Sequence, residues 1–283
     1  MRLKKRILIT GIKGFLGCNL VNSLRDYQLF GLGTKDESFE GIQVFSSGNL
    51  EVLNIKIDVV IICHAAVVSG NTVVSNDLLY EVNVSLTEKI VNKFTEAYII
   101  YVSTTSVYEI NKNILTEHSN VCPQSNYGLS KFWAERIVLL KEKASVLRIS
   151  SMFGIEMKEN TLIPNYVNQA LKDKEILVWG TGERLQNYIH VDDVAKYINL
   201  MIEAKDKVSG QIILGVSLKE YSNLEIATMI SKITGAKIKF VNQDNSNSLA
   251  YNNEFSTTLL KWKPNIGIEE RLQKYIEWKQ KKY

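Results

Sequence analysis

Short apolar runs alternate with longer amphipathic stretches through the first half of the chain. Runs rich in Val, Ile and Leu predict buried strands at residues 6–10, 28–32, 42–45, 58–63, 97–102 and 144–149. Between them, apolar residues recur at helical spacing over residues 15–25, 77–94 and 127–143. Continuous apolar strands that alternate with helices are typical of a parallel sheet covered on both faces.

The pattern loosens after residue 154. Helical spacing returns at residues 162–172, 224–234 and 269–279, and residues 176–179 and 237–241 favour extended strands. Residues 242–253 are rich in Asn and Ser and predict a surface loop. We expect a first domain over 1–154, to which 184–204 return, and a smaller α/β substrate-binding domain formed mainly by 155–283.

Composition narrows the class of protein. The 283 residues are 45% hydrophobic and 23% charged, which excludes a wholly disordered chain. No apolar run approaches the roughly 20 residues of a membrane span, and the apolar run after the basic residues 1–6 is too short for a secretory signal. A net charge of +4 does not favour nucleic acid, and the three cysteines lack metal-binding spacing. We expect a cytoplasmic protein without a bound metal.

A glycine-rich turn joins the first predicted strand to the first predicted helix. Gly11, Gly14 and Gly17 follow the spacing G-x-x-G-x-x-G. Such glycines permit a tight turn, close backbone approach to a pyrophosphate, and close packing of helix on strand. The helix N-terminus at Phe15 and Leu16 then presents free N–H groups and a positive dipole end to phosphates. The turn therefore predicts a dinucleotide site in a Rossmann-like, doubly wound parallel sheet.

The end of the second predicted strand bears on the choice of cofactor. An acidic residue about 20 residues after the turn usually accepts hydrogen bonds from the ribose of NAD. Gly33 stands at that position, and Thr34 and Lys35 follow it. A hydroxyl and a cation suit a 2′-phosphate, so the sequence favours NADP(H) over NAD(H). The alternative is that Asp36 or Glu37 replaces the missing acid.

A Tyr-x-x-x-Lys pair carries the candidate chemistry. Tyr127 and Lys131 lie near the start of a predicted helix, where positions i and i+4 share one face. A neighbouring ammonium favours the phenolate of a tyrosine, whose ordinary pKa is about 10. Tyr127 can then remove a proton from a hydroxyl or return one to a ketone.

The order of these motifs resembles the extended branch of the short-chain dehydrogenase/reductase superfamily. In that branch a Ser or Thr lies four residues before the Tyr of a Val-Tyr pair, and Thr104 stands in this relation to Tyr108. Further segments similar to the family lie at residues 58–66, 83–87, 123–135, 148–154, 188–195 and 260–264. Together they resemble NAD(P)-dependent sugar-nucleotide epimerases, dehydratases and reductases.

The resemblance implies roles for individual residues. Catalysis is expected from Thr104, Tyr127 and Lys131. The cofactor is expected to contact Gly11, Gly14, Phe15, Leu16, Gly17, Thr34, Lys35, Ala65, Ala66, Asn83, Tyr127 and Lys131. The substrate is expected to be a nucleotide sugar used in cell-surface polysaccharide synthesis, bound by Thr104, Tyr127, Ser151, Arg184 and Gln186. A homodimer is expected through helix 77–94 and the helix of Tyr127.

Polar residues at positions 190–193 are expected to be structural. A lone histidine between Ile and Val, such as His190, is more often a core residue than a catalyst. Asp192 and Asp193 are expected to cap the N-terminus of the following helix.

Several positions depart from the family pattern and limit the reaction. The dehydratases carry Asp-Glu directly after the strand-end Thr, whereas Thr105 and Ser106 follow here, so 4,6-dehydration is not expected. Ser151 and Gln186 replace an Asn and an Arg that face the nucleotide, and Arg184 can supply the missing cation. Of the reactions of this family, hydride transfer at C4 of the sugar is the one that these departures leave open. The sequence favours an NADPH-dependent 4-keto-sugar-nucleotide reductase; an NAD-dependent 4-epimerase and a non-catalytic NAD(P)-binding regulator are the alternatives.

Overall fold

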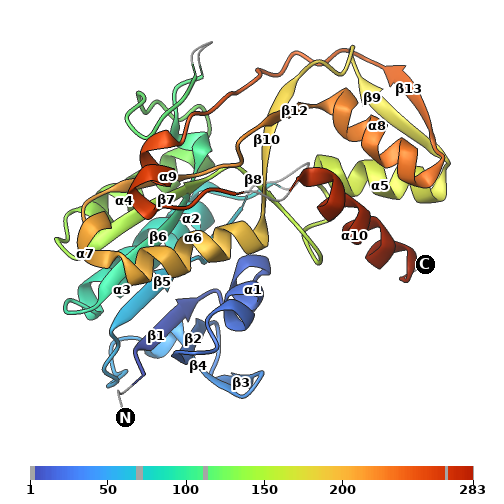
Figure 1. Cartoon of the computed structure of the whole chain (residues 1–283). Coiled ribbons are helices and arrows are strands. Elements are labelled where there is room, and N and C mark those ends of the chain that lie inside the picture. Colours follow the sequence, from blue (N-terminus) through green and yellow to red (C-terminus); the bar gives the residue numbers. More distant parts are fainter. Residues whose placement is uncertain (1–3, 68–72, 111–113, 265–266, 283) are drawn as a thin grey trace.

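The computed structural model describes residues 4–67, 73–110, 114–264 and 267–282 (Figure 1). Residues 1–3 of the basic N-terminal segment lie outside this range. Its strands are β1 Arg6–Thr10, β2 Gln28–Gly33, β3 Glu37–Phe39, β4 Ile42–Ser46, β5 Val59–Ile62, β6 Tyr98–Thr104, β7 Ala144–Ile149, β8 Ser151–Phe153, β9 Glu175–Trp179, β10 Leu185–His190, β11 Ile212–Gly215, β12 Glu220–Ser222 and β13 Lys237–Val241. Its α-helices are α1 Phe15–Ser23, α2 Asn76–Leu79, α3 Leu86–Lys93, α4 Asn126–Leu139, α5 Leu162–Lys172, α6 Val191–Glu203, α7 Lys205–Val208, α8 Asn223–Thr234, α9 Glu254–Leu260 and α10 Ile268–Gln280.

Eight strands form the main sheet in the order β11-β7-β6-β5-β1-β2-β4-β3. Every neighbouring pair is parallel except β3 and β4, which are antiparallel. The chain leaves β1 toward β2 on one side and later reaches β5 on the other, so the strand order reverses beside β1. Ligands of such sheets bind at the carboxyl ends of the strands at this reversal. The predicted α/β, doubly wound fold is confirmed.

Two apolar layers cover the main sheet. One contains Leu16, Leu20 and Val21 of α1 together with Val194 and Ile198 of α6. The opposite layer is formed by residues of α3 and α4, among them Ile90, Val91, Ala134 and Val138. Strands buried on both faces have no polar side to present, which explains the continuous apolar runs in the sequence.

A smaller C-terminal part packs beside the sheet (Figure 1). It contains a three-stranded sheet, β12-β10-β8, and a pair of parallel strands, β13 and β9. Helices α5, α8 and α10 bury Val167, Ile226, Ile230, Leu272 and Ile276 in a third apolar cluster. The division at residue 154 stays a proposal; the structure also brings β11 into the main sheet.

Residues 77–94, expected to form one helix, are divided. A π-helical segment, Tyr80–Ser85, separates α2 from α3. Segments of this kind frequently occur at functional sites. Here the segment contains Asn83, which is buried. Among the described residues, no helix is long and apolar enough to cross a bilayer.

Candidate functional site

The glycine turn brings α1 unusually close to β1. Gly11 has φ +65°, and a Cβ atom there would lie 2.9 Å from the Cα of His64. A Cβ at Gly17 would overlap the carbonyl oxygen of Gly11 and lie 2.6 Å from the carbonyl carbon of Ile12. Gly14 precedes α1 without a side-chain cap. The first N–H groups of α1 are therefore open to an anionic ligand.

A cavity of about 580 Å³ lies along the carboxyl ends of β1, β2, β5 and β6. Its described lining residues are Gly11–Gly17, Gly33, Thr34, Glu37, Cys63–Ala65, Val67, Val82, Val102–Thr104, Tyr127, Lys131, Ile149, Ser150, Met152, Met157, Lys158 and Thr161. In the strand order, Glu37 of β3 is separated from Thr104 of β6 by β5, β1, β2 and β4, so the two residues lie at opposite ends of the cavity. Lys158 and Thr161 belong to the C-terminal part. An open helix N-terminus and a side-chain-free turn fit a dinucleotide.

Thr104, Tyr127 and Lys131 meet at this cavity. Thr104 ends β6, and Tyr127 and Lys131 lie in the first turns of α4. Ser125 caps α4 by accepting a 3.1 Å hydrogen bond from the Gly128 amide. A Cβ at Gly128 would lie 2.5 Å from the carbonyl oxygen of Ser106, so glycine there lets α4 approach the end of β6.

Burial sets the protonation of these groups. It lowers the pKa of Lys131 to about 7 and raises the pKa of Tyr127 to about 12. The Lys131 ammonium donates a 2.7 Å hydrogen bond to the Val102 carbonyl and lies 4.1 Å from the ring centre of Tyr101. The Thr104 hydroxyl donates to Ser106 Oγ over 3.1 Å. The arrangement can move a proton to or from a hydroxyl placed between Thr104 and Tyr127.

The far end of the cavity contains a carboxylate that faces two lysines. Glu37 Oε1 lies 2.9 Å from Lys13 Nζ, and Glu37 Oε2 lies 3.8 Å from Lys35 Nζ. The hydrogen bond from Lys13 lowers the pKa of Glu37. Asp36 is turned elsewhere, because its oxygens accept hydrogen bonds of 2.9 Å from the Ser46 amide and the Asn49 side chain. Of the two acids left open by the sequence, Glu37 reaches the cavity.

Comparison with known proteins identifies the family. The model of the NAD dependent epimerase/dehydratase family matches residues 7–215. The chain belongs to the NAD-dependent epimerase/dehydratase family. This is an enzyme family of sugar-nucleotide epimerases and dehydratases that use NAD(P), as the sequence motifs implied.

Individual relatives are distant. A Methanocaldococcus jannaschii protein provisionally named UDP-glucose 4-epimerase is 25% identical over 301 residues, covering 96% of this chain and 97% of that protein. A Dictyostelium discoideum dTDP-D-glucose 4,6-dehydratase is 28% identical over 152 residues, which are 48% of this chain and only 35% of the dehydratase. A Bacillus cereus UDP-glucuronic acid 4-epimerase, solved with a UDP-sugar and NAD, has a TM-score of 0.87 at 21% identity, covering 98% of this chain and 100% of that one.

In this epimerase/dehydratase chain, Asn83 acts on the loop that bounds the cavity. Its side chain accepts a 2.8 Å hydrogen bond from the Ala66 amide and donates to the Ala66 carbonyl over 3.1 Å. It also donates to Ser130 Oγ of α4 over 2.9 Å. Ala65 lines the cavity, whereas Ala66 and Asn83 hold its wall from behind. Lys35, also expected at the cofactor, is 70% exposed and outside the lining.

His64 and Cys63 both bind the end of β1. His64 Nδ1 lies 2.7 Å from Thr10 Oγ1, and the Cys63 thiol donates to the Thr10 carbonyl over 2.8 Å. Burial lowers the pKa of His64 to about 4 and raises the pKa of Cys63 to about 12. Both side chains are therefore neutral near pH 7, and their contacts with Thr10 join the end of β5 to β1.

The expected substrate residues Ser151, Arg184 and Gln186 lie outside the described lining of the cavity. Arg184 Nε donates to the Asn247 carbonyl over 3.3 Å, and Gln186 donates to the Asn223 side chain over 2.8 Å. Ser151 is exposed on β8. Their role at the substrate stays a prediction.

Sequence reasoning missed Lys158 and Thr161, which do line the cavity. Thr161 precedes α5 without capping it, so the first amides of this helix are open beside Lys158. The available signal was a predicted helix that begins four residues after a lysine. His190, not Asp192 or Asp193, caps α6: its Nδ1 accepts a 3.2 Å hydrogen bond from the Asp192 amide.

Proposed function

We propose that the protein is an NAD-dependent 4-epimerase of a nucleoside-diphosphate sugar. The observation that carries this proposal is the charge of the cavity wall: Glu37 is the only carboxylate among its described lining residues, and it lies at the end of the cavity away from Thr104. Thr105 and Ser106 stand where a dehydratase needs an acid and a base. With no described carboxylate beside Thr104, the cavity favours hydride exchange at one carbon over the elimination of water.

Tyr127 would remove the proton of the C4 hydroxyl and later return it. Thr104 would orient the same oxygen by a hydrogen bond. Since burial raises the pKa of Tyr127 to about 12, bringing it near 7 requires roughly 7 kcal/mol of stabilisation from the positive charges of Lys131 and the oxidised cofactor. NAD, when bound, would accept the hydride of C4 and give it back to the opposite face of the sugar.

Glu37 supports NAD rather than the NADP(H) favoured by the sequence. A carboxylate at the end of the cavity can accept hydrogen bonds from ribose hydroxyls, but it repels a 2′-phosphate. The similar Bacillus cereus epimerase was solved with NAD. Lys13 and Lys35 beside Glu37 favour the second candidate, an NADPH-dependent 4-keto reductase, because they could pair with that phosphate if Glu37 moved aside.

Lys158 and the open N-terminus of α5 would hold the substrate diphosphate. Three lysines line the cavity among the described residues. Lys13 pairs with Glu37, and Lys131 donates to Val102 beside Tyr127, which leaves Lys158 for an anion at the C-terminal part.

A homodimer in the cytoplasm is part of the same proposal. Leu78, Tyr80, Leu129 and Trp133 are each about half exposed on the α2–π segment and α4, and the rings of Tyr80 and Trp133 lie 5.6 Å apart. Apolar residues gathered on two adjacent helical segments suit an isologous helix-packed interface. Sedimentation of Trp133→Glu against wild type tests this part separately.

Epimerase activity is tested by incubating purified protein with UDP-glucose or UDP-glucuronic acid and following the C4 epimer by NMR. Tyr127→Phe should lower kcat by about 10²- to 10⁴-fold while NAD binding persists. Tyr27→Phe, outside the described lining of the cavity, is the matched control and should keep full activity. Consumption of NADPH with a 4-keto sugar nucleotide and no epimer would favour the reductase; NAD binding without any turnover would favour the regulator.

A further inference from the structure

A second cavity, of about 180 Å³, lies where β10, α6, α10 and the loop between β11 and β12 meet. It lies next to the catalytic cavity across β8: Met152 lines the catalytic one and Phe153 lines this one. Its polar walls are supplied by His190, Asp193, Lys219, Tyr221 and Arg271. No part of the proposed epimerase reaction uses these residues.

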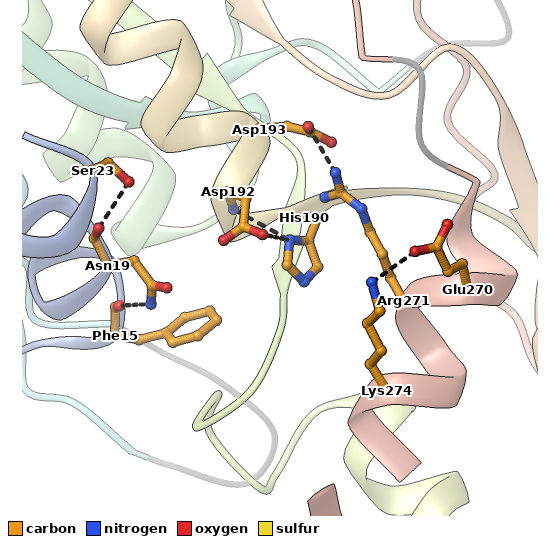
Figure 2. Close-up of polar contacts among 9 residues, drawn as sticks. All are labelled: Phe15, Asn19, Ser23, His190, Asp192, Asp193, Glu270, Arg271 and Lys274. Atoms are coloured by element: carbon orange, nitrogen blue, oxygen red, sulfur yellow. Dashed lines mark hydrogen bonds and ion pairs between the residues drawn. The ribbon is translucent and has the colours of Figure 1, made fainter. Parts of the chain in front are cut away.

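Arg271 is the buried charge of this cavity. The residue is only 6% exposed, and its Nη2 atom donates a 2.9 Å hydrogen bond to Asp193 Oδ1 at the start of α6. Figure 2 shows this side chain reaching from α10 to Asp193, with His190 beside it. Its Nη1 atom is buried and has no hydrogen-bond partner among the described residues. A buried guanidinium N–H without an acceptor is costly, so an acceptor in the cavity would stabilise it.

The remaining charges around the cavity also favour an anion. Lys219 stands at the rim with its side chain 60% exposed; its ammonium lies 3.3 Å from Glu225 and 4.6 Å from the ring centre of Tyr221, and it would leave Glu225 to reach an anion in the cavity. Gly267 precedes α10 without a side-chain cap, which adds the positive end of a helix to the wall. Within the described lining, Asp193 balances Arg271 and Lys219 adds one further positive charge, which is partly offset by Glu225 outside the lining.

Besides Asp193, which lines the cavity, and Asp192, which lies 3.3 Å from His190 Nδ1, three further carboxylates oppose an anion from nearby. Glu269 and Glu270 lie in the first turn of α10, but both are exposed and neither lines the cavity. Glu270 is paired with Lys274 over 2.7 Å (Figure 2). Glu225 is engaged by the amide of Ser222, also over 2.7 Å. The charges of Glu269 and Glu270 are therefore directed to solvent or to Lys274, and that of Glu225 is shared between Ser222 and Lys219.

We propose that this second cavity binds a small oxyanion, either a phosphate or the carboxylate of a molecule of few carbons, between Arg271 Nη1 and Lys219. An arginine that already donates one Nη to Asp193 offers its other edge to a phosphate or carboxylate oxygen, the geometry that guanidinium groups favour. The volume admits such a group with a few waters and excludes a nucleotide.

The test is calorimetric titration of inorganic phosphate into NAD-saturated protein, with malonate as a second arm that distinguishes phosphate from carboxylate. Arg271→Gln should weaken binding at least 10-fold, and Lys219→Gln severalfold. Lys274→Gln, one turn along α10 on its exposed face, should bind as wild type does. The tighter of the two probes identifies the chemistry.

Absence of binding by wild type to both probes would overturn the proposal, as would equal binding by Arg271→Gln. Arg271→Gln could fail to fold because Asp193 loses its partner. The test then rests on Lys219→Gln, which should fold because the Lys219 side chain is exposed. An unchanged affinity of Lys219→Gln for both probes would reject the site. Epimerase activity is not used as a readout, so failure of this proposal does not bear on the proposed function.

Discussion

The ammonium of Lys131 donates a 2.7 Å hydrogen bond to the carbonyl oxygen of Val102 at the end of β6. The lysine is 2% exposed, so a charge needed beside Tyr127 is held in a poorly solvated place. Burial lowers its pKa from 10.5 to about 7. Folding therefore costs free energy below pH 10.5, because Lys131 must either bury its charge or release its proton, and this cost depends on pH.

Stability should rise with pH between 7 and 10.5, relative to a variant without this titration. In that window the unfolded chain keeps a proton on Lys131 that the folded chain has released, so raising the pH favours the folded state. Urea unfolding of cofactor-free wild type and Lys131→Met at several pH values should show a difference growing by at most about 1.4 kcal/mol per pH unit. Parallel curves for the two proteins would contradict the low pKa.

Glu37 should control the choice of cofactor. Glu37→Gln removes the carboxylate that we propose accepts hydrogen bonds from the ribose, and it should weaken NAD binding by about 10-fold, the value of one charged hydrogen bond. It should also bring NADP closer to NAD in affinity, because repulsion of a 2′-phosphate is lost. Glu40→Gln, exposed and outside the cavity, is the control. Titration of both cofactors into each variant measures the ratio, and an unchanged ratio would remove Glu37 from the cofactor site.

Glu135 and Arg148 form a buried ion pair. Removing one partner should lower the free energy of unfolding more than replacing both partners with apolar residues. Both side chains are almost fully buried and make contacts of 2.7 Å and 3.0 Å. Glu135→Leu leaves an unpaired buried guanidinium and should cost about 3–5 kcal/mol, whereas adding Arg148→Met should recover most of it. Denaturant unfolding measures both.

The exposed pair between Lys143 and Glu96 is the comparison for that experiment. Glu96→Gln should change stability by less than about 1 kcal/mol. If the double variant at Glu135 and Arg148 is no more stable than Glu135→Leu alone, the cost lies in lost packing and not in the unpaired charge.

Gly17→Ala should damage both stability and cofactor binding. Its Cβ would lie 2.6 Å from the carbonyl carbon of Ile12, so α1 would have to move away from β1 and the glycine turn would open. Overpacking of this kind costs about 1–3 kcal/mol. Thermal unfolding and NAD titration measure the two effects. At Gly48 the nearest atom to a Cβ is 3.5 Å away, so Gly48→Ala should leave both unchanged.

Local patterns in the sequence determined the elements and the core of the site. Residues 6–10, 162–172 and 237–241 form β1, α5 and β13 as expected, because apolar spacing reports the face that each segment buries. Tyr127 and Lys131 share one helix face at i and i+4, and the glycine turn joins a strand to a helix. Both motifs depend on contacts a few residues apart, which sequence spacing records directly.

Only the tertiary structure decided which distant side chains share a cavity. The short strands β8 and β11 lack enough residues for a periodic signal, and β3 pairs with β4 in a way that turns Asp36 toward Ser46 and Glu37 toward the cavity. Arg271 meets Asp193 although 78 residues separate them. Such pairings follow from how whole elements pack, because their orientation is fixed by burial summed over many residues and no local spacing encodes it.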